Sequence, residues 1–123
     1  MSDHASVLAA NAAFYAAMRA GDLGMMDSLW SRQRQVACAH PSGQMLQGRQ
    51  AVMDSWTMIL GHGGAVPVVH CAAQAVVTGS TALVLCEEWV GLDQLMTANA
   101  FAFEEGAWRM ISHQAAPMPG TVR

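Results

Sequence analysis

The second half of the chain contains four long runs of β-forming residues separated by very short gaps, and no other feature restricts the fold as strongly. Each gap holds glycine together with serine or an acidic residue, which are turn-forming combinations. Strands joined by such short turns pair antiparallel. The sequence therefore predicts an antiparallel meander that ends at Pro117, with strands at residues 66–78, 81–90, 95–104 and 108–116.

The first half of the chain has helical periodicity instead. One helix face repeats with the spacing i, i+4, i+7 and i+11, and it consists of Val7, Asn11, Phe14 and Met18. Gly21 is placed to end this helix, and Asp22 can cap a second helix that reaches Trp30. A third helix is predicted over residues 49–60.

Two shorter strands are predicted between the second and third helices. The segment 35–40 alternates weakly and stops at Pro41, which cannot donate to a strand ladder. Residues 45–47 form the second short strand after a turn. Three N-terminal helices followed by a strongly curved, mostly antiparallel sheet predict an α+β domain with the helices packed in the sheet.

Length and composition exclude several classes of protein. The chain has 123 residues, and we expect one domain over residues 1–123. Apolar residues make up 53% and charged residues only 12%, so the sequence is too hydrophobic for intrinsic disorder. The net charge is −3 and there is no lysine. A nucleic-acid partner is therefore not expected, and Schiff-base catalysis by a lysine is excluded.

Location follows from the targeting and redox signals. The first residues have no basic start and no compact apolar stretch, so they do not resemble a signal peptide. No uncharged apolar run approaches the roughly 18 residues of a membrane span. Cys38, Cys71 and Cys86 form an odd set without C-x-x-C spacing, which favours buried free thiols. We expect a cytoplasmic protein with no membrane partner.

Four sequence strings carry a family resemblance: FYAAMRAGDLGMMDSLW at 14–30, AHPSG at 39–43, LQGRQAVMDSW at 46–56 and TANAFAFEEGAWRMISHQAAPM at 97–118. In this order they resemble the nuclear transport factor 2-like superfamily, in its SnoaL-like and ketosteroid-isomerase-like branch. The resemblance implies a cone-shaped fold whose bent sheet wraps the first helix around a deep apolar pocket. It also implies a homodimer that pairs through the outer face of the sheet.

The resemblance points to two catalytic candidates. His40 stands where the isomerases have their general base, an aspartate, and a neutral imidazole can accept a proton near pH 7. Asn99 stands where they have a protonated acid that donates to the oxyanion, and an amide N–H can also donate. The alternatives are a histidine that organises the end of its strand and an amide bonded to a polar neighbour. Cys38 shares the strand face of His40, but an i, i+2 spacing of about 6–7 Å is too wide for a direct hydrogen bond.

The pocket is expected to be lined by aromatic, methionine and polar side chains from several elements: Phe14, Tyr15, Met18, Trp56, Glu88, Phe101, Met110 and Gln114. The family's helix tyrosine matches Phe14, and the phenol of Tyr15, one residue later, is turned by about 100°. The phenol is therefore expected to point elsewhere, which departs from the isomerase pattern.

Strand alternation leaves two choices open. Glu87 and Glu88 take opposite faces of their strand, so one of them faces inward. On a regular strand His113 has the opposite parity to Met110 and Gln114, so only one of these sets is expected to face inward.

These features predict a small-molecule-binding protein whose pocket transfers a proton on an apolar carbonyl ligand, as in isomerases and cyclases. His40 would move the proton, and Asn99 would stabilise the enolate. The alternative is a non-catalytic binding or dimerisation domain. A further alternative, a hydrolase or dehydratase, requires Glu87 or Glu88 close to His40 or His113. No metal or other cofactor is expected, because the five histidines show no metal-ligand spacing.

Overall fold

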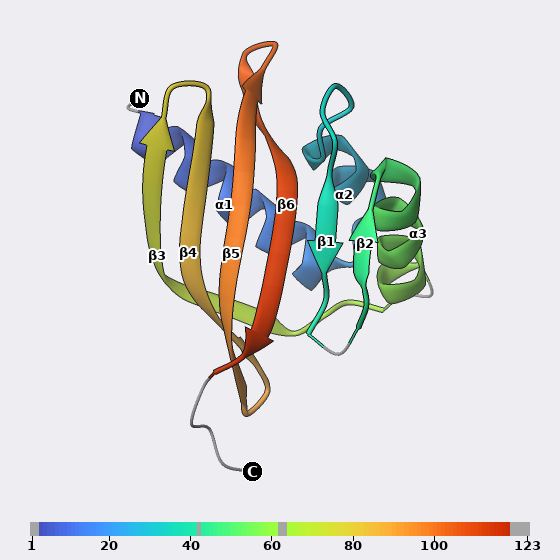
Figure 1. The fold of residues 1–123 in the computed structure, drawn as a ribbon. Coiled ribbons are helices and arrows are strands. Elements are labelled where there is room, and N and C mark those ends of the chain that lie inside the picture. Colours follow the sequence, from blue (N-terminus) through green and yellow to red (C-terminus); the bar gives the residue numbers. More distant parts are fainter. Residues whose placement is uncertain (1–2, 42, 62–63, 119–123) are drawn as a thin grey trace.

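The computed structural model describes residues 3–41, 43–61 and 64–118. Its elements follow the chain in this order: α1 (Asp3–Ala20), α2 (Leu23–Leu29), β1 (Ala37–Ala39), β2 (Met45–Gln47), α3 (Arg49–Leu60), β3 (Val68–Thr78), β4 (Thr81–Val90), β5 (Asp93–Glu104) and β6 (Ala107–Pro117). The predicted α+β class is confirmed: three helices pack against a curved, mostly antiparallel sheet (Figure 1).

The six strands form one sheet in the order β2-β1-β6-β5-β4-β3. The meander β3 to β6 is antiparallel throughout, as the short turns require. Strands β1 and β6 pair in parallel, and their register sets Cys38 beside His113. The pairing places the segment that follows β1 next to the last strand, although they are far apart in sequence.

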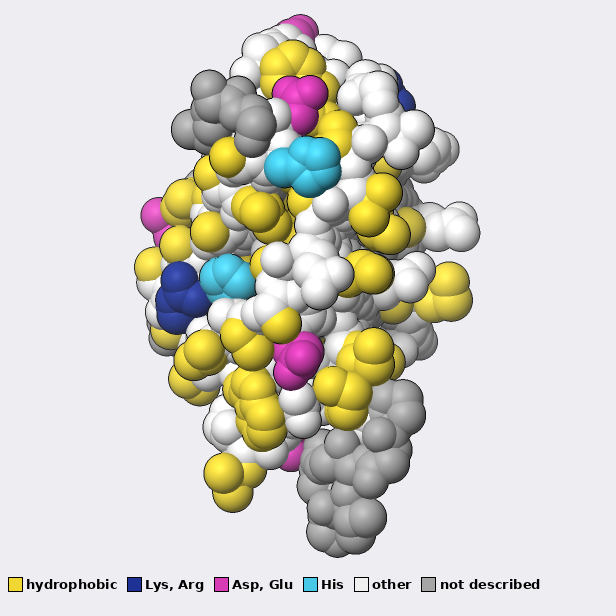
Figure 2. Space-filling model, turned by 90° about the vertical axis from the view of Figure 1, so that its left-hand side faces the viewer, with side chains coloured by type: hydrophobic (Ala, Val, Ile, Leu, Met, Phe, Trp, Pro, Cys, Tyr) yellow, Lys and Arg dark blue, Asp and Glu magenta, His cyan; other side chains and the backbone are white. Residues whose placement is uncertain are grey.

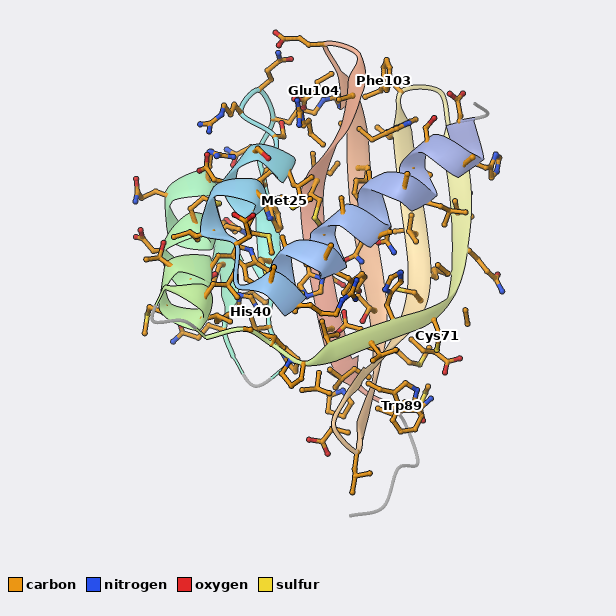
Figure 3. The ribbon with its side chains drawn as sticks, turned by 180° about the vertical axis from the view of Figure 1, so that it is seen from behind. Met25, His40, Cys71, Trp89, Phe103 and Glu104 are labelled. Carbon is orange, nitrogen blue, oxygen red and sulfur yellow. The ribbon has the colours of Figure 1, made fainter. Side chains whose placement is uncertain are left out.

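The first helix crosses the concave face of the sheet, and α2 and α3 cover the end formed by β1 and β2 (Figures 1 and 3). Gly21 has a φ of +63°, which lets the chain leave α1 at once. Asp22 then caps α2, because its side chain accepts a hydrogen bond from the backbone N–H of Met25 at 3.0 Å. Both predictions are therefore confirmed: Gly21 ends α1, and Asp22 caps α2.

The core lies between α1 and the sheet. The predicted face of α1 is buried, and so is Tyr15 beside it. The largest fully buried side chains are Trp30, Trp56, Tyr15, Phe14 and Phe101. Burial of aromatic groups of this size supplies most of the hydrophobic stabilisation of such a domain.

Two sequence predictions need correction. The strand expected over residues 35–40 is limited to Ala37–Ala39, since β2 and β6 provide pairing partners only there. Cys71 is exposed, whereas Cys38 and Cys86 are buried as expected.

The face seen from the β3 side carries scattered hydrophobic side chains and few charges (Figure 2). No helix in the described part of the chain is long and apolar enough to cross a membrane.

Candidate functional site

A cavity of about 330 Å³ opens between the end of α1, α3 and the sheet. Its volume lies at the lower end of the range for small-molecule sites. Three of its polar side chains come from three separate elements: His40 after β1, Glu88 on β4 and His113 on β6. The rest of the wall is mostly apolar, and the full lining consists of Met18, His40, Pro41, Trp56, Ile59, Val66, Glu88, Val90, Asp93, Leu95 and His113.

His40 is held by the third helix. Its Nε2 lies 2.9 Å from the Oγ of Ser55, and that hydroxyl donates to the carbonyl of Val52 at 2.6 Å. Because the single hydroxyl hydrogen is used on Val52, Ser55 accepts from His40, and Nε2 carries the hydrogen. Nδ1 then keeps its lone pair. Burial lowers the pKa of His40, so the imidazole is uncharged near pH 7.

The sulfur of Cys38 lies closer to His40 than strand geometry suggests, at 3.5 Å from Nε2. The separation predicted for Cys38 and His40 assumed that both residues lie on one strand. It is wrong because β1 ends at Ala39 and His40 lies beyond its last residue. Burial raises the pKa of Cys38 to about 12, so it remains a thiol. The pair is therefore not an activated nucleophile.

Behind the cavity, a chain of buried hydrogen bonds connects α1 with the sheet. The hydroxyl of Tyr15 donates to Oε2 of Glu88 at 2.5 Å. The amide nitrogen of Asn99 donates to Oδ1 of Asn11 at 2.9 Å and to the phenolic oxygen of Tyr15 at 3.1 Å. Nδ1 of His113 lies 2.6 Å from Oδ1 of Asn99. All five side chains are buried, and none of them is more than 2% exposed.

The direction of each bond in this chain is determined. Both amide hydrogens of Asn99 are used on Asn11 and Tyr15, so its oxygen must face His113. His113 therefore donates through Nδ1 and keeps a lone pair on Nε2. Burial and the neighbouring His40 lower the pKa of His113 to about 3, so this imidazole is also uncharged.

Glu88 is the buried acid of the cavity. Burial raises its pKa above the ordinary value, and the hydrogen bond from Tyr15 opposes this effect. Among the described residues that line the cavity there is no Lys or Arg. Across the strands, Glu88 is in register with His70, whose ring stacks on Tyr15 at 4.4 Å between ring centres. The structure thus selects Glu88, and not Glu87, as the inward residue.

His113 reaches the cavity because of a bulge in β6. The register passes from Phe101 opposite Met110 to Ala100 opposite Ser112, so Ile111 is an extra residue. The extra residue reverses the alternation, and both Met110 and His113 are buried. The expectation that only one parity set faces inward is therefore wrong, since it assumed a regular strand.

The expected site residues divide into three groups. The cavity wall includes His40, Met18, Trp56 and Glu88. Behind the wall, in the core or in the polar chain, lie Asn99, Phe14, Tyr15, Phe101 and Met110. Gln114 lies on the outer face of the sheet, where it lines another depression. The place expected for Gln114 is taken by His113, and only the position of the bulge could have indicated this.

Tyr15 stands one residue after the position that matches the isomerase tyrosine, yet its phenol meets Asn99 and Glu88. Phe14, at the matching position, packs on Trp56 and His113 at 5.5 Å and 4.9 Å between ring centres. No group of three or more His, Cys, Asp or Glu side chains gathers among the described residues, which do not include His62.

Comparisons with known proteins give consistent matches. A family model described as a SnoaL-like domain matches residues 7–119. The structure of an inferred dehydratase of the NTF2-like family from Streptomyces avermitilis is 30% identical. It covers 94% of this chain and 96% of its own, with a TM-score of 0.86. An inferred calcium/calmodulin-dependent protein kinase type II association domain from Thiobacillus denitrificans is 29% identical. It covers 90% of this chain and 94% of its own, with a TM-score of 0.79.

Among curated proteins, the F-box protein SKIP8 of Arabidopsis thaliana is 27% identical over 116 residues. The match covers 92% of this chain and 50% of the relative. The chain therefore spans about half the length of this relative.

Proposed function

Because the chain belongs to the SnoaL-like domain family, within the nuclear transport factor 2-like superfamily, we propose that its cavity binds a small apolar carbonyl compound and transfers a proton on it. One observation carries this proposal. His40 and Glu88 line the same largely apolar cavity, and burial favours the uncharged form of both. A base and an acid that face one ligand are the groups that proton transfer next to a carbonyl requires.

In the proposed reaction, Nδ1 of His40 removes a proton from the carbon next to the carbonyl group. The electron pair of that C–H bond moves into a carbon–carbon double bond, and the carbonyl oxygen becomes an enolate oxygen that carries the negative charge. The carboxyl hydrogen of Glu88 stabilises that oxygen through a hydrogen bond. His40 then returns its proton to another carbon, which gives an isomer and restores the free base. The transfer uses no cofactor.

Asn99 acts in this proposal by positioning other groups. Its amide hydrogens are both used inside the protein, so the donor to the ligand oxygen is Glu88. Asn99 orients Tyr15, which donates to Glu88, and it orients His113. The resemblance to an inferred dehydratase supports the same chemistry, because dehydration of a carbonyl compound also begins with removal of a proton from carbon.

The experiment that tests the reaction is deuterium exchange of 2-tetralone, a small bicyclic ketone, in D₂O followed by NMR. We expect the protein to accelerate exchange of the hydrogens next to the carbonyl group. His40→Ala should lose about 10²–10⁴-fold of this acceleration. His4→Ala is the matched control, because His4 is an exposed histidine on α1. Equal rates for His40→Ala and wild type would reject His40 as the base.

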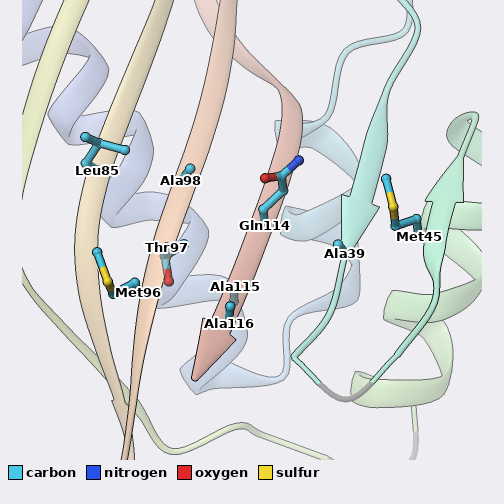
Figure 4. A pocket seen from close by; sticks show the side chains of 9 residues that line it. All are labelled: Ala39, Met45, Leu85, Met96, Thr97, Ala98, Gln114, Ala115 and Ala116. Atoms are coloured by element: carbon cyan, nitrogen blue, oxygen red, sulfur yellow. The ribbon is translucent and has the colours of Figure 1, made fainter. Parts of the chain in front are cut away.

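The alternative function is association through the outer face of the sheet. That face has a depression of about 470 Å³, whose rim includes Leu85 on β4, Met96 on β5 and Met45 on β2 (Figure 4). Alanines of β1, β5 and β6 form its floor, so a partner can approach closely. We propose a second copy of the chain as this partner. The resemblance to an association domain supports the proposal.

A cytoplasmic location is part of the same proposal. It is supported by the cysteines, which are all free in the structure although Cys71 is exposed.

A further inference from the structure

His113 holds a buried hydrogen-bond acceptor that the reaction above does not use. Its ring is 2% exposed and belongs to the cavity wall. The Nδ1 edge is turned to Asn99, which lies behind the wall, so the edge that carries Nε2 faces the cavity. No side chain in the described part of the chain bonds to Nε2.

The protein fixes which nitrogen of His113 carries the hydrogen. Donation from Asn99 to both Asn11 and Tyr15 determines the direction of its amide, and the amide oxygen then requires N–H at Nδ1 of His113. The opposite tautomer would place two lone pairs 2.6 Å apart in a buried site. Four side chains from α1, β5 and β6 thus act together to keep Nε2 as an acceptor.

We propose that Nε2 of His113 accepts a hydrogen bond from a hydroxyl group of the ligand, so that the cavity selects small carbonyl compounds that also carry a hydroxyl. This inference rests on the proposed function and specifies its substrate class. An apolar group at the same place would leave Nε2 buried without a partner, which lowers affinity.

The three polar groups then have separate tasks. His40 faces the carbon that loses the proton, Glu88 faces the carbonyl oxygen, and His113 faces the hydroxyl. Because burial lowers the pKa of His113 to about 3, this residue does not compete with His40 for the proton. His113 is therefore a specificity residue in this scheme, and His40 remains the base.

The test compares the dissociation constants of 2-tetralone, its four hydroxy isomers at ring positions 5 to 8, and the four matching methoxy compounds. We expect at least one hydroxy isomer to bind about 5–10-fold more tightly than both its methoxy counterpart and 2-tetralone. In His113→Leu this ratio should fall to about one. In His113→Gln, which keeps an acceptor, part of the preference should remain. Equal affinities in wild type, or a preference that survives in His113→Leu, would overturn the inference.

A second measurement uses only the wild-type protein, so it does not depend on how a variant folds. The ¹⁵N resonances of His113 should show a protonated Nδ1 and an unprotonated Nε2. The Nε2 resonance should move upfield when the preferred hydroxy isomer binds. A protonated Nε2 in the free protein would overturn the inference. The two proposals can fail separately. If the protein accelerates exchange of the tetralones but shows no preference for a hydroxyl group, only this inference is rejected. If it binds hydroxy isomers selectively but does not accelerate exchange, only the proposed reaction is rejected.

Discussion

The phenol of Tyr15 lies 2.5 Å from the carboxyl group of Glu88, and this contact connects the central helix to the wall of the cavity. Tyr15 is fully buried on α1, whereas Glu88 belongs to both the buried chain and the cavity lining. The bond favours the ionised form of Glu88, and burial favours the uncharged form. The protonation of Glu88 therefore depends on the position of α1.

Replacement of Tyr15 by phenylalanine tests this dependence. Tyr15→Phe removes a hydrogen bond that lowers the pKa of Glu88, so the pKa should rise further. The pH above which tetralone exchange decreases should move upward. The variant should also lose about 1–3 kcal/mol of stability in urea unfolding, because it leaves Asn99 without one of its acceptors. A downward shift of the alkaline limb would contradict this account of the bond.

The pH profile of exchange in the wild type should be bell-shaped. Protonation of His40 stops the reaction on the acid side, at a pH below the ordinary imidazole value of 6.5. Ionisation of Glu88 stops it on the alkaline side, at a pH above the ordinary carboxyl value of 4.5. Glu88→Gln keeps a donor but cannot ionise, so the alkaline limb should disappear while the acid limb remains. An alkaline limb that persists in Glu88→Gln would assign it to another group.

Acid should destabilise the protein through His113. The folded pKa of about 3 lies below the unfolded value of 6.5, so the stabilising effect of the uncharged ring is lost as the pH falls through this interval. The contribution of this one group is about 1.4 kcal/mol per pH unit. In urea unfolding, His113→Gln should show a correspondingly weaker pH dependence between these values. His4→Gln, at an exposed position, is the control and should behave as wild type.

Association through the outer face is tested by a charge in its depression. Met96→Glu places a carboxylate where an apolar partner surface is expected, and Met96 is 51% exposed. Sedimentation should show dimers for the wild type and monomers for this variant. Leu92→Glu is the control, because Leu92 is 93% exposed but does not line the depression. Monomers at all concentrations in the wild type would reject the association proposal.

Arg49 is expected to matter far more for stability than Arg32, although both pair with Asp27. Arg49 is partly buried and donates to the carbonyls of Trp30 and Asp27 and to the Asp27 carboxylate. Its bonds join α2 to α3. Arg49→Ala should cost about 2–3 kcal/mol in urea unfolding, whereas Arg32→Ala should cost at most about 1 kcal/mol. Equal effects would mean that the bonds to the carbonyls contribute nothing.

Much of the fold could be predicted because the strongest signals are local. Turn residues located the hairpins of β3 to β6 to within about two residues, and the face of α1 followed from apolar spacing. The segment at 35–40 was less accurate, since its strand depends on partners that come much later in the chain. The sequence pattern predicts the lengths of long elements, whereas the length of a short strand depends on its pairing partners.

The site was only partly predictable. The resemblance brought attention to His40 and Asn99, and the structure connects Asn99 with the cavity only through Tyr15 and His113. That connection depends on side chains from three elements whose mutual register no local pattern reveals. The sequence also could not predict the direction of the Tyr15 phenol, since it depends on the close approach of α1 to β4.

The extra residue at Ile111 has a consequence for how such a cavity can change during evolution. Upstream of it, the inward positions of β6 include Trp108 and Met110, and downstream they include His113. Deletion of Ile111 would give a regular ladder in which His113 still lies opposite Asn99 and faces inward, whereas a β6 that paired Ile111 as a ladder residue would turn His113 outward and Gln114 inward. The pairing of this one residue therefore determines whether an imidazole or an amide faces the cavity, without any substitution at the site.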